Sequence, residues 1–350
     1  MRTDVLPAGG TAALSQDATP RLRIARDCAR EYWRARRAPR FTRADPVRLQ
    51  HSLDVLARGG RTMLADDPVF LLASGWRTGS TLLQRVLVTD PALLMWGEPL
   101  GRMALLPRLA EMLAAVDDRW PTPESATLPQ DPSGLATSWI ANLYPGNGDL
   151  RQGLRALLDS WLAAPARRRG YVRWGVKEVR LGAAEACVLR WLYPAARFIL
   201  LLRHPFDSYR SARNWRLYSR WPDETVDCAV AFARHWNRLA VSWNARTTGL
   251  DPLVIRYEDL VSGKFDFERL GNSLDLQLAP ERALSSRPGV RRTRRELCSY
   301  ERRLVVREAA AGMEAFGYLP DGSTAVWKQP GLPAQSGSTI HGEEPLKCPE

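Results

Sequence analysis

The stretch FLLASGWRTGSTLLQRVL, residues 70–87, combines residue types that could hold an anion. An apolar run ends in a turn bounded by Gly75 and Gly79, and a helical pattern follows it. The first amides of a helix have no partner inside the helix, and the helix dipole adds roughly half a positive charge there. Arg77 supplies a full charge and a planar set of donors. Further donors are the hydroxyls of Thr78, Ser80 and Thr81. The turn predicts a phosphate or sulfonate site, with a helix cap beside an unrelated arginine as the alternative.

This turn differs from the P-loop of nucleoside triphosphatases, which requires G-x-x-x-x-G-K-[ST]. Only three residues separate Gly75 from Gly79, and Ser80 stands where the P-loop lysine would be. The loop is therefore one residue shorter, and its cation lies inside it. A magnesium-dependent nucleotide kinase or NTPase is kept as an alternative function. It would require ATP and a metal ion, whereas the sequence predicts no metal site.

A second stretch, LLRHPFDSYRSARNW, has the same organisation. An apolar strand ends at Arg203, and Pro205 lies near the first turn of the next helix, where its missing N–H costs little. Ser211 follows eight residues after Arg203, two turns into that helix. An arginine and a hydroxyl in these positions could hold one phosphate between them. The alternative is a surface arginine and an unrelated serine.

The two stretches together resemble a known family. GWRTGSTLL is similar to the 5′-phosphosulfate loop of sulfotransferases that use 3′-phosphoadenosine 5′-phosphosulfate (PAPS), and RHPFDSYRS is similar to their 3′-phosphate motif, R-x-P-x-x-x-x-x-S. The branch with arginine in the first loop, which includes tyrosylprotein sulfotransferases and many bacterial enzymes, fits best. The resemblance covers about residues 68–320. It implies an α/β fold with a parallel sheet flanked by helices, the P-loop-NTPase-like sulfotransferase fold.

The resemblance also implies roles for single residues. Glu98, in a Gly-Glu pair 21 residues after Arg77, would be the catalytic base, and Lys177, 26 residues before Arg203, would stabilise the bridging oxygen of the leaving group. Arg77 with residues 78–81 would hold the 5′-phosphate and sulfonate. The remaining implied nucleotide contacts are Arg203 and Ser211 at the 3′-phosphate, Tyr257 of the YEDL element beside adenine, and Ser286 in a late closing segment.

Several of these assignments have alternatives. Glu98 could cap the helix that starts near Leu100, and Lys177 could be an exposed lysine at a strand end. Other side chains that could act as the base are His51, His204 and His235. Among these, His204 is expected to border the nucleotide and His235 to be structural. A non-catalytic basic protein that binds anions is the remaining alternative function.

The composition limits the kinds of binding partner to be expected. The formal charge is +12, but only four of the 50 basic residues are lysine, which suggests arginine spread over solvated faces rather than a nucleic-acid surface. The five cysteines are scattered and never in CxxC spacing, which favours a reducing compartment. No apolar run reaches membrane-spanning length. We expect a cytoplasmic protein with no nucleic-acid or membrane partner, and leave open a homodimer.

The elements that must position these residues follow from local patterns. Short apolar runs at residues 69–74, 92–99, 171–180, 196–203 and 251–260 alternate with helical segments, as in a parallel sheet between helices. Site residues should then lie at the carboxyl ends of the strands. Residues 102–116 are expected to form a helix interrupted by Pro107, and residues 223–247 a long amphipathic helix.

The expected organisation is one sulfotransferase domain over residues 21–320, between a disordered start (1–20) and a flexible tail (321–350). Within it, residues 21–60 form a helical extension. Residues 118–165 form an insertion of loop and helix near the acceptor, a small molecule with a hydroxyl group. Tryptophans that could wall an apolar acceptor pocket, or belong to the core, are Trp120, Trp139 and Trp161.

Overall fold

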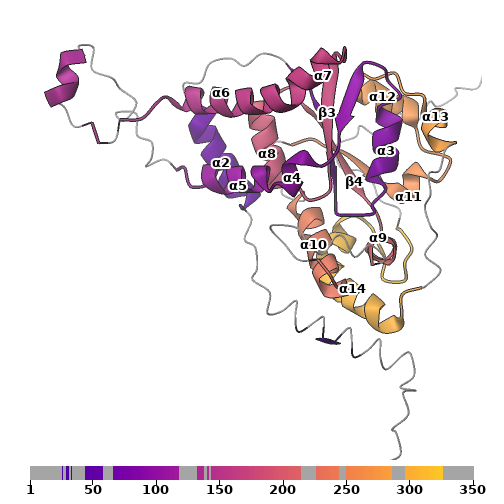
Figure 1. The fold of residues 1–350 in the computed structure, drawn as a ribbon. Helices are drawn as coiled ribbons and strands as arrows, with labels where there is room; N and C mark the ends of the chain where they lie inside the picture. Colours follow the sequence, from indigo (N-terminus) through magenta and orange to yellow (C-terminus); the bar gives the residue numbers. More distant parts are fainter. Residues whose placement is uncertain are drawn as a thin grey trace, which may run out of the picture.

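A five-stranded parallel sheet forms the centre of the computed structural model, with strand order β2-β3-β1-β4-β5. The structure describes residues 26, 29–30, 33, 44–57, 66–117, 132–137, 140–141, 143–213, 226–243, 250–285 and 296–325. The strands are β1 (Val69–Ala73), β2 (Leu93–Trp96), β3 (Arg173–Glu178), β4 (Arg197–Leu202) and β5 (Leu253–Arg256). The expected α/β fold, a parallel sheet flanked by helices, is confirmed (Figure 1).

Helices cover both faces of the sheet (Figure 1). One core cluster combines the strands with α2 (Pro46–Ala57), α4 (Pro99–Arg102), α5 (Leu105–Leu113), α6 (Asn147–Leu158), the π-helix η3 (Asp159–Ala163), α7 (Ala164–Arg168) and α8 (Ala183–Leu192). The opposite cluster combines them with α3 (Ser80–Leu87), α9 (Pro205–Ala212), α10 (Ala229–Ser242), α11 (Tyr257–Leu260), α12 (Phe267–Leu274), α13 (Pro280–Leu284) and α14 (Ser299–Ala315). A short 3₁₀ helix, η2, spans Pro132–Thr137.

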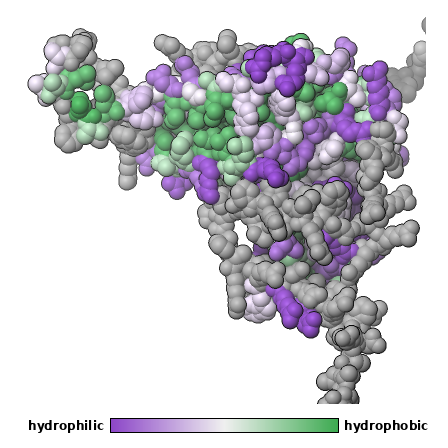
Figure 2. Space-filling model, viewed as in Figure 1, coloured by the Kyte–Doolittle hydropathy of each residue, from purple (hydrophilic) through white to green (hydrophobic). Residues whose placement is uncertain are grey.

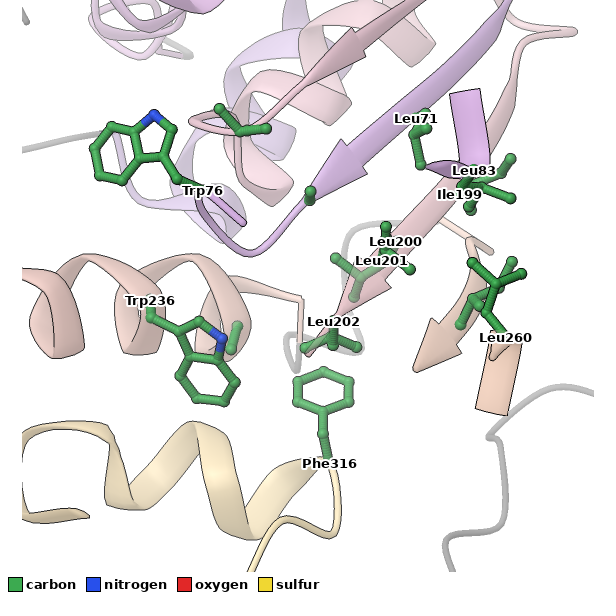
Figure 3. Close-up of a cluster of buried hydrophobic side chains, with 14 of the residues drawn as sticks. Leu71, Trp76, Leu83, Ile199, Leu200, Leu201, Leu202, Trp236, Leu260 and Phe316 are labelled. Atoms are coloured by element: carbon green, nitrogen blue, oxygen red, sulfur yellow. The ribbon is translucent and has the colours of Figure 1, made fainter. Parts of the chain in front are cut away.

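The central strand β1 is buried on both faces, which explains its unbroken run of apolar residues in the sequence. Its five residues are all buried, and alternate side chains enter opposite cores: Leu71 belongs to one cluster and Leu72 to the other. Figure 3 shows the core cluster that contains Leu71, together with Leu83 and leucines of β4. Each fully buried leucine stabilises the fold by about 1.5–3 kcal/mol.

The helix break expected at Pro107 lies elsewhere. Helix α4 ends at Arg102, Ala104 takes a left-handed conformation (φ 53°), and α5 begins at Leu105. Pro107 is the third residue of α5, where a missing N–H removes no intrahelical bond. The prediction of an interruption at Pro107 was therefore wrong by one turn.

The C-terminal part of the described chain closes against β5. Tyr318 forms a bridge with Thr324, and Arg256 at the end of β5 donates to the Ala325 carbonyl (3.0 Å). The predicted domain boundary at residue 320 falls inside this turn. Of the predicted helical extension over residues 21–60, α2 is described and most of residues 21–43 lie outside the described residues. Helix α10 covers the central part of the predicted 223–247 helix.

Candidate active site

The predicted site residues that the structure describes follow the carboxyl ends of all five strands. The loop 74–79 follows β1, Glu98 follows β2, and Arg203 and Tyr257 directly follow β4 and β5. Lys177 is the next-to-last residue of β3. Because the strands are parallel, their carboxyl ends share one edge of the sheet, where ligands of open α/β folds bind.

The loop between β1 and α3 has an unusual backbone conformation at three of its residues. Gly75 (φ 122°), Arg77 (φ 64°) and Gly79 (φ 93°) all have positive φ. For an arginine this conformation costs roughly 1–2 kcal/mol, and such strain is typical of functional loops. The Thr78 hydroxyl donates to the Gly75 carbonyl (3.1 Å), so this side chain braces the loop from inside. Helix α3 has no side-chain cap, which leaves its first amides directed at the loop.

The two predicted anion-binding corners are in direct contact. Arg77 Nε donates to the Ser211 hydroxyl on α9 (2.9 Å), and the Arg203 guanidinium donates to the Arg77 carbonyl (2.9 Å). The corners come from β1 and β4, which are neighbours in the sheet. They therefore lie on the same side of the sheet edge, close enough for one nucleotide to contact both.

Tyr257 joins the same group. Its ring packs on Gly79 so closely that a Cβ at that position would lie 2.1 Å from the ring carbon Cδ2. The Arg203 guanidinium lies over the same ring, 4.3 Å from its centroid, in cation–π geometry. The Tyr257 ring thus supports both the loop and Arg203. An additional contact with adenine stays a prediction.

Glu98 and Lys177 form an ion pair at the ends of neighbouring strands, with Lys177 Nζ donating to Glu98 Oε1. The register explains the contact, because Trp96 pairs with Val176 and the residues that follow are brought side by side. The Lys177 side chain is 8% exposed and that of Glu98 is 27% exposed, so solvent reaches the carboxylate more readily than the ammonium group. Glu98 makes no side-chain cap to α4, which excludes the helix-cap alternative in this structure.

The acidic residue that does hold α4 is Glu178, which sequence reasoning missed. Its Oε1 accepts the backbone N–H groups of Leu100 (2.6 Å) and Gly101 (2.9 Å). It is fully buried, and burial raises its pKa to about 8 although the Gly101 and Leu100 amides and Lys177 act in the opposite direction. The only sequence signal was an acidic residue next to Lys177 inside an apolar strand.

The histidines considered as rival bases have other contacts. His204 Nδ1 accepts the Phe206 N–H (3.2 Å), so its ring proton lies on Nε2, which donates to the Leu319 carbonyl (3.1 Å). This buried ring connects the 318–325 turn to α9, and a contact of His204 with the nucleotide stays a prediction. His235 is fully buried and stacks on Trp76 of the loop, 4.7 Å between ring centroids, in agreement with a structural role.

His204 gives the stability a testable pH dependence. Burial lowers its pKa below the usual 6.5. The unfolded chain then binds a proton that the folded chain resists, so stability present above about pH 6.5 is lost as the pH falls through the folded pKa. We expect the difference in unfolding free energy between wild type and His204→Asn, which keeps an N-cap acceptor but does not titrate, to shrink as the pH falls. Denaturant unfolding at several pH values measures this; a constant difference would contradict it.

Some predicted residues lie outside the described residues: Ser286, Trp120 and Trp139. Trp161, on η3, is 37% exposed and so is not part of the core. In the described part of the chain, no group of three or more histidine, cysteine, aspartate or glutamate side chains is arranged to hold a metal ion. No described helix combines the length and apolarity needed to cross a membrane.

The fold and the site define an α/β protein with a glycine-bounded loop between its first strand and the following helix. The chain belongs to the sulfotransferase family, whose sequence profile matches residues 68–279, well over half of its length. The match runs from just before β1 to the end of the α12–α13 connection and contains every described site residue. A comparison with curated proteins gave no match. The predicted family and fold are confirmed, and the chain is a transferase of sulfuryl groups.

Proposed function

We propose that this sulfotransferase uses PAPS as its donor and transfers the sulfuryl group to a hydroxyl of a small molecule. The observation that carries the proposal is the direct contact between the two anion-binding corners, Arg77 with Ser211 and Arg203 with the Arg77 carbonyl. A donor with a phosphate at each end of one nucleoside would use both corners. ATP lacks the 3′-phosphate that the second corner would bind.

The loop after β1 would hold the 5′ end of the donor. Gly75 and Gly79 adopt positive φ without the strain a side chain would add, and this lets the loop backbone turn toward the start of α3, where phosphate and sulfonate oxygens would bind. The α3 amides and the Arg77 guanidinium then donate to those oxygens, together with the hydroxyls of Ser80 and Thr81. Since Arg77 is bound to Ser211 in this structure, nucleotide binding would exchange that hydrogen bond for a stronger, charge-assisted one.

The corner after β4 would hold the 3′-phosphate. Arg203 is oriented there by two contacts, its hydrogen bond to the Arg77 carbonyl and its position over the Tyr257 ring. Its planar set of donors suits phosphate oxygens, and Ser211 adds a hydroxyl from α9. Ser286 would complete this side, and Tyr257 would border the adenine. These contacts would distinguish PAPS from nucleotides phosphorylated only at the 5′ end.

The ion pair at the ends of β2 and β3 would carry the chemistry. When bound, the donor supplies an activated sulfonate whose S–O bond to the bridging phosphate oxygen breaks as the acceptor oxygen attacks in line. Lys177 would neutralise charge on the bridging oxygen, and Glu98 would accept the proton of the acceptor hydroxyl. Their ion pair at the sheet edge supports a reaction site where both groups are close to the transferred sulfur.

The surface beside Glu98 supports an acceptor with apolar surface, such as a phenol or an aliphatic alcohol. Trp96, two residues before Glu98, donates from its indole N–H to the Leu162 carbonyl on η3 (3.0 Å), which fixes η3 next to this turn. Exposed apolar side chains on the adjoining helices include Met103, Leu157 and Trp161. Figure 2 shows hydrophobic side chains gathered over α6 and the helices beside it.

A thermal-shift comparison tests the donor. We expect adenosine 3′,5′-bisphosphate (PAP), without metal and in the presence of EDTA, to raise the melting temperature at micromolar concentrations, because a ligand at about 100 times its Kd stabilises the folded state by about 2.7 kcal/mol. ATP with Mg²⁺ and adenosine 5′-monophosphate are the matched comparisons. A shift with ATP and Mg²⁺ alone would indicate a nucleotide kinase or NTPase, and no shift with any of them would indicate a non-catalytic basic protein.

A further inference from the structure

The turn that carries Glu98 is held from the neighbouring strand. Glu98 occupies the N-cap position of α4, followed by Pro99, which has no N–H, and then by Leu100 and Gly101. At the N-cap position a side-chain oxygen can accept the N–H of the second or third residue of its own helix. Here both of those amides donate to Glu178 Oε1 instead, at 2.6 Å and 2.9 Å.

Two consecutive residues of β3 therefore hold the same turn. Side chains of consecutive strand residues point to opposite faces of the sheet. Lys177 reaches the Glu98 carboxylate, while Glu178, fully buried on the other face, reaches the backbone two and three residues later. The carboxylate of Glu98 and the backbone behind it are thus fixed by separate partners.

The fit around Glu178 leaves little room for another arrangement. A Cβ built on Gly101 would lie 2.6 Å from Glu178 Oε2 and 3.3 Å from the Arg180 Cβ. Among the described residues, Oε2 has no hydrogen-bond partner, so the interaction with the turn depends on Oε1 alone. A glycine at position 101 allows the carboxyl group to approach both amides at once.

From this arrangement we propose that Glu178 is a positioning residue for the sulfuryl-transfer site: it occupies the amides that Glu98 would otherwise cap, and so keeps the Glu98 carboxylate at Lys177 and available to the acceptor hydroxyl. The inference rests on the proposed function, in which Glu98 is the base. Glu178 itself contacts neither nucleotide nor acceptor, because it is closed off from solvent. Without it, the carboxylate of Glu98 turns back onto its own helix.

The test compares Glu178→Ala with Glu178→Gln, which keeps an acceptor oxygen. Turnover of PAPS to PAP is measured with 4-nitrophenol as the probe acceptor and with water alone, and the Kd for PAP is measured by calorimetry. We expect Glu178→Ala to lose about 10- to 100-fold in kcat, part of the contribution typical of a general base, with the Kd for PAP unchanged. Glu178→Gln should retain kcat within a few-fold. Unchanged kcat in Glu178→Ala, or a parallel loss of PAP affinity, would overturn the proposal.

A second pair of variants changes Gly101, the residue that contacts the Glu178 carboxyl group, and a control glycine. Gly101→Ala places a methyl group against the Glu178 carboxyl and should lower kcat in the same way. Gly153→Ala, on the exposed surface of α6 with open space around it, is the matched control and should leave kcat unchanged. If Glu178→Ala does not fold, Glu178→Asp, which shortens the side chain but keeps a carboxyl group, replaces it.

A crystal structure of the variant separates this inference from the proposed function. In Glu178→Ala, the Glu98 carboxylate should lie within hydrogen-bonding distance of the Leu100 and Gly101 amides, away from Lys177. A carboxylate that stays on Lys177 would overturn the inference whatever the activity. Failure of the wild type to bind PAP would instead refute the proposed donor, and the position of Glu98 in the variant would still decide the role of Glu178.

Discussion

Replacing Arg203 by alanine should reduce the affinity for PAP by about 100-fold or more. The guanidinium would donate charge-assisted hydrogen bonds to the 3′-phosphate, each contributing about 1.5–3 kcal/mol, and two such bonds lost correspond to this factor or a larger one. Arg203 also donates to the Arg77 carbonyl and covers the Tyr257 ring, so its removal loosens the 5′ corner as well. Calorimetric titration of PAP into the variant measures the loss.

Two comparisons make this result specific. Arg108→Ala removes the same charge from an exposed position on α5, where the arginine pairs with Glu111, and should leave PAP affinity within about two-fold because surface ion pairs contribute little. Arg203→Lys keeps the charge but loses the planar set of donors and should recover only part of the affinity. If Arg203→Ala binds PAP as tightly as Arg108→Ala does, the 3′-phosphate is not bound at this corner.

The parts of the site that the sequence predicted are those encoded locally. Loop 74–79 and Arg203 each follow an apolar run and precede a helical pattern, and both features are visible within about ten residues. A parallel sheet then places all such junctions at one edge, whatever the order of the strands. The contact between Arg77 and Ser211 additionally needed β1 and β4 to be neighbours, which no local pattern specifies.

The parts that were missed or misplaced depend on tertiary contacts. Glu178 looks like an ordinary polar residue near a strand end, and its role is set by amides 77 and 78 residues earlier in the chain, on α4. His204 adjoins Arg203 in the sequence, yet its ring bonds to the Leu319 carbonyl, more than a hundred residues later. A side chain's neighbours in space decided both cases.

The position of the helix break near Pro107 also could not be predicted from local sequence alone. A proline penalises a helix only where it removes an intrahelical N–H or clashes with the preceding turn, so its effect depends on where the helix starts. Helix α5 starts at Leu105, directly after the left-handed Ala104, so Pro107 falls in its first turn, where its missing N–H removes no intrahelical bond.

Replacing Glu98 by glutamine should lower the turnover of PAPS by about 100- to 1,000-fold, because general-base catalysis contributes about 10²–10⁴ and glutamine cannot accept the proton. Affinity for PAP should stay the same or increase. The substitution removes a negative charge beside Lys177, whose ammonium group would then attract the donor's anionic groups more strongly. A large fall in kcat without weaker nucleotide binding identifies a group that acts in the transition state.

The matched control is Glu111→Gln on α5, which removes the same charge from a surface pair with Arg108 and should leave both kcat and PAP affinity unchanged.

The Lys177→Met variant removes the other member of the ion pair and is compared with Glu98→Gln. It should lower kcat as strongly as Glu98→Gln but also weaken PAP binding, because a cation is lost beside the 5′ group. The two variants share one ion pair but should shift nucleotide affinity in opposite directions. Equal effects on kcat and on affinity in both would mean that the pair only maintains the structure of the sheet edge, and the base would then be another residue.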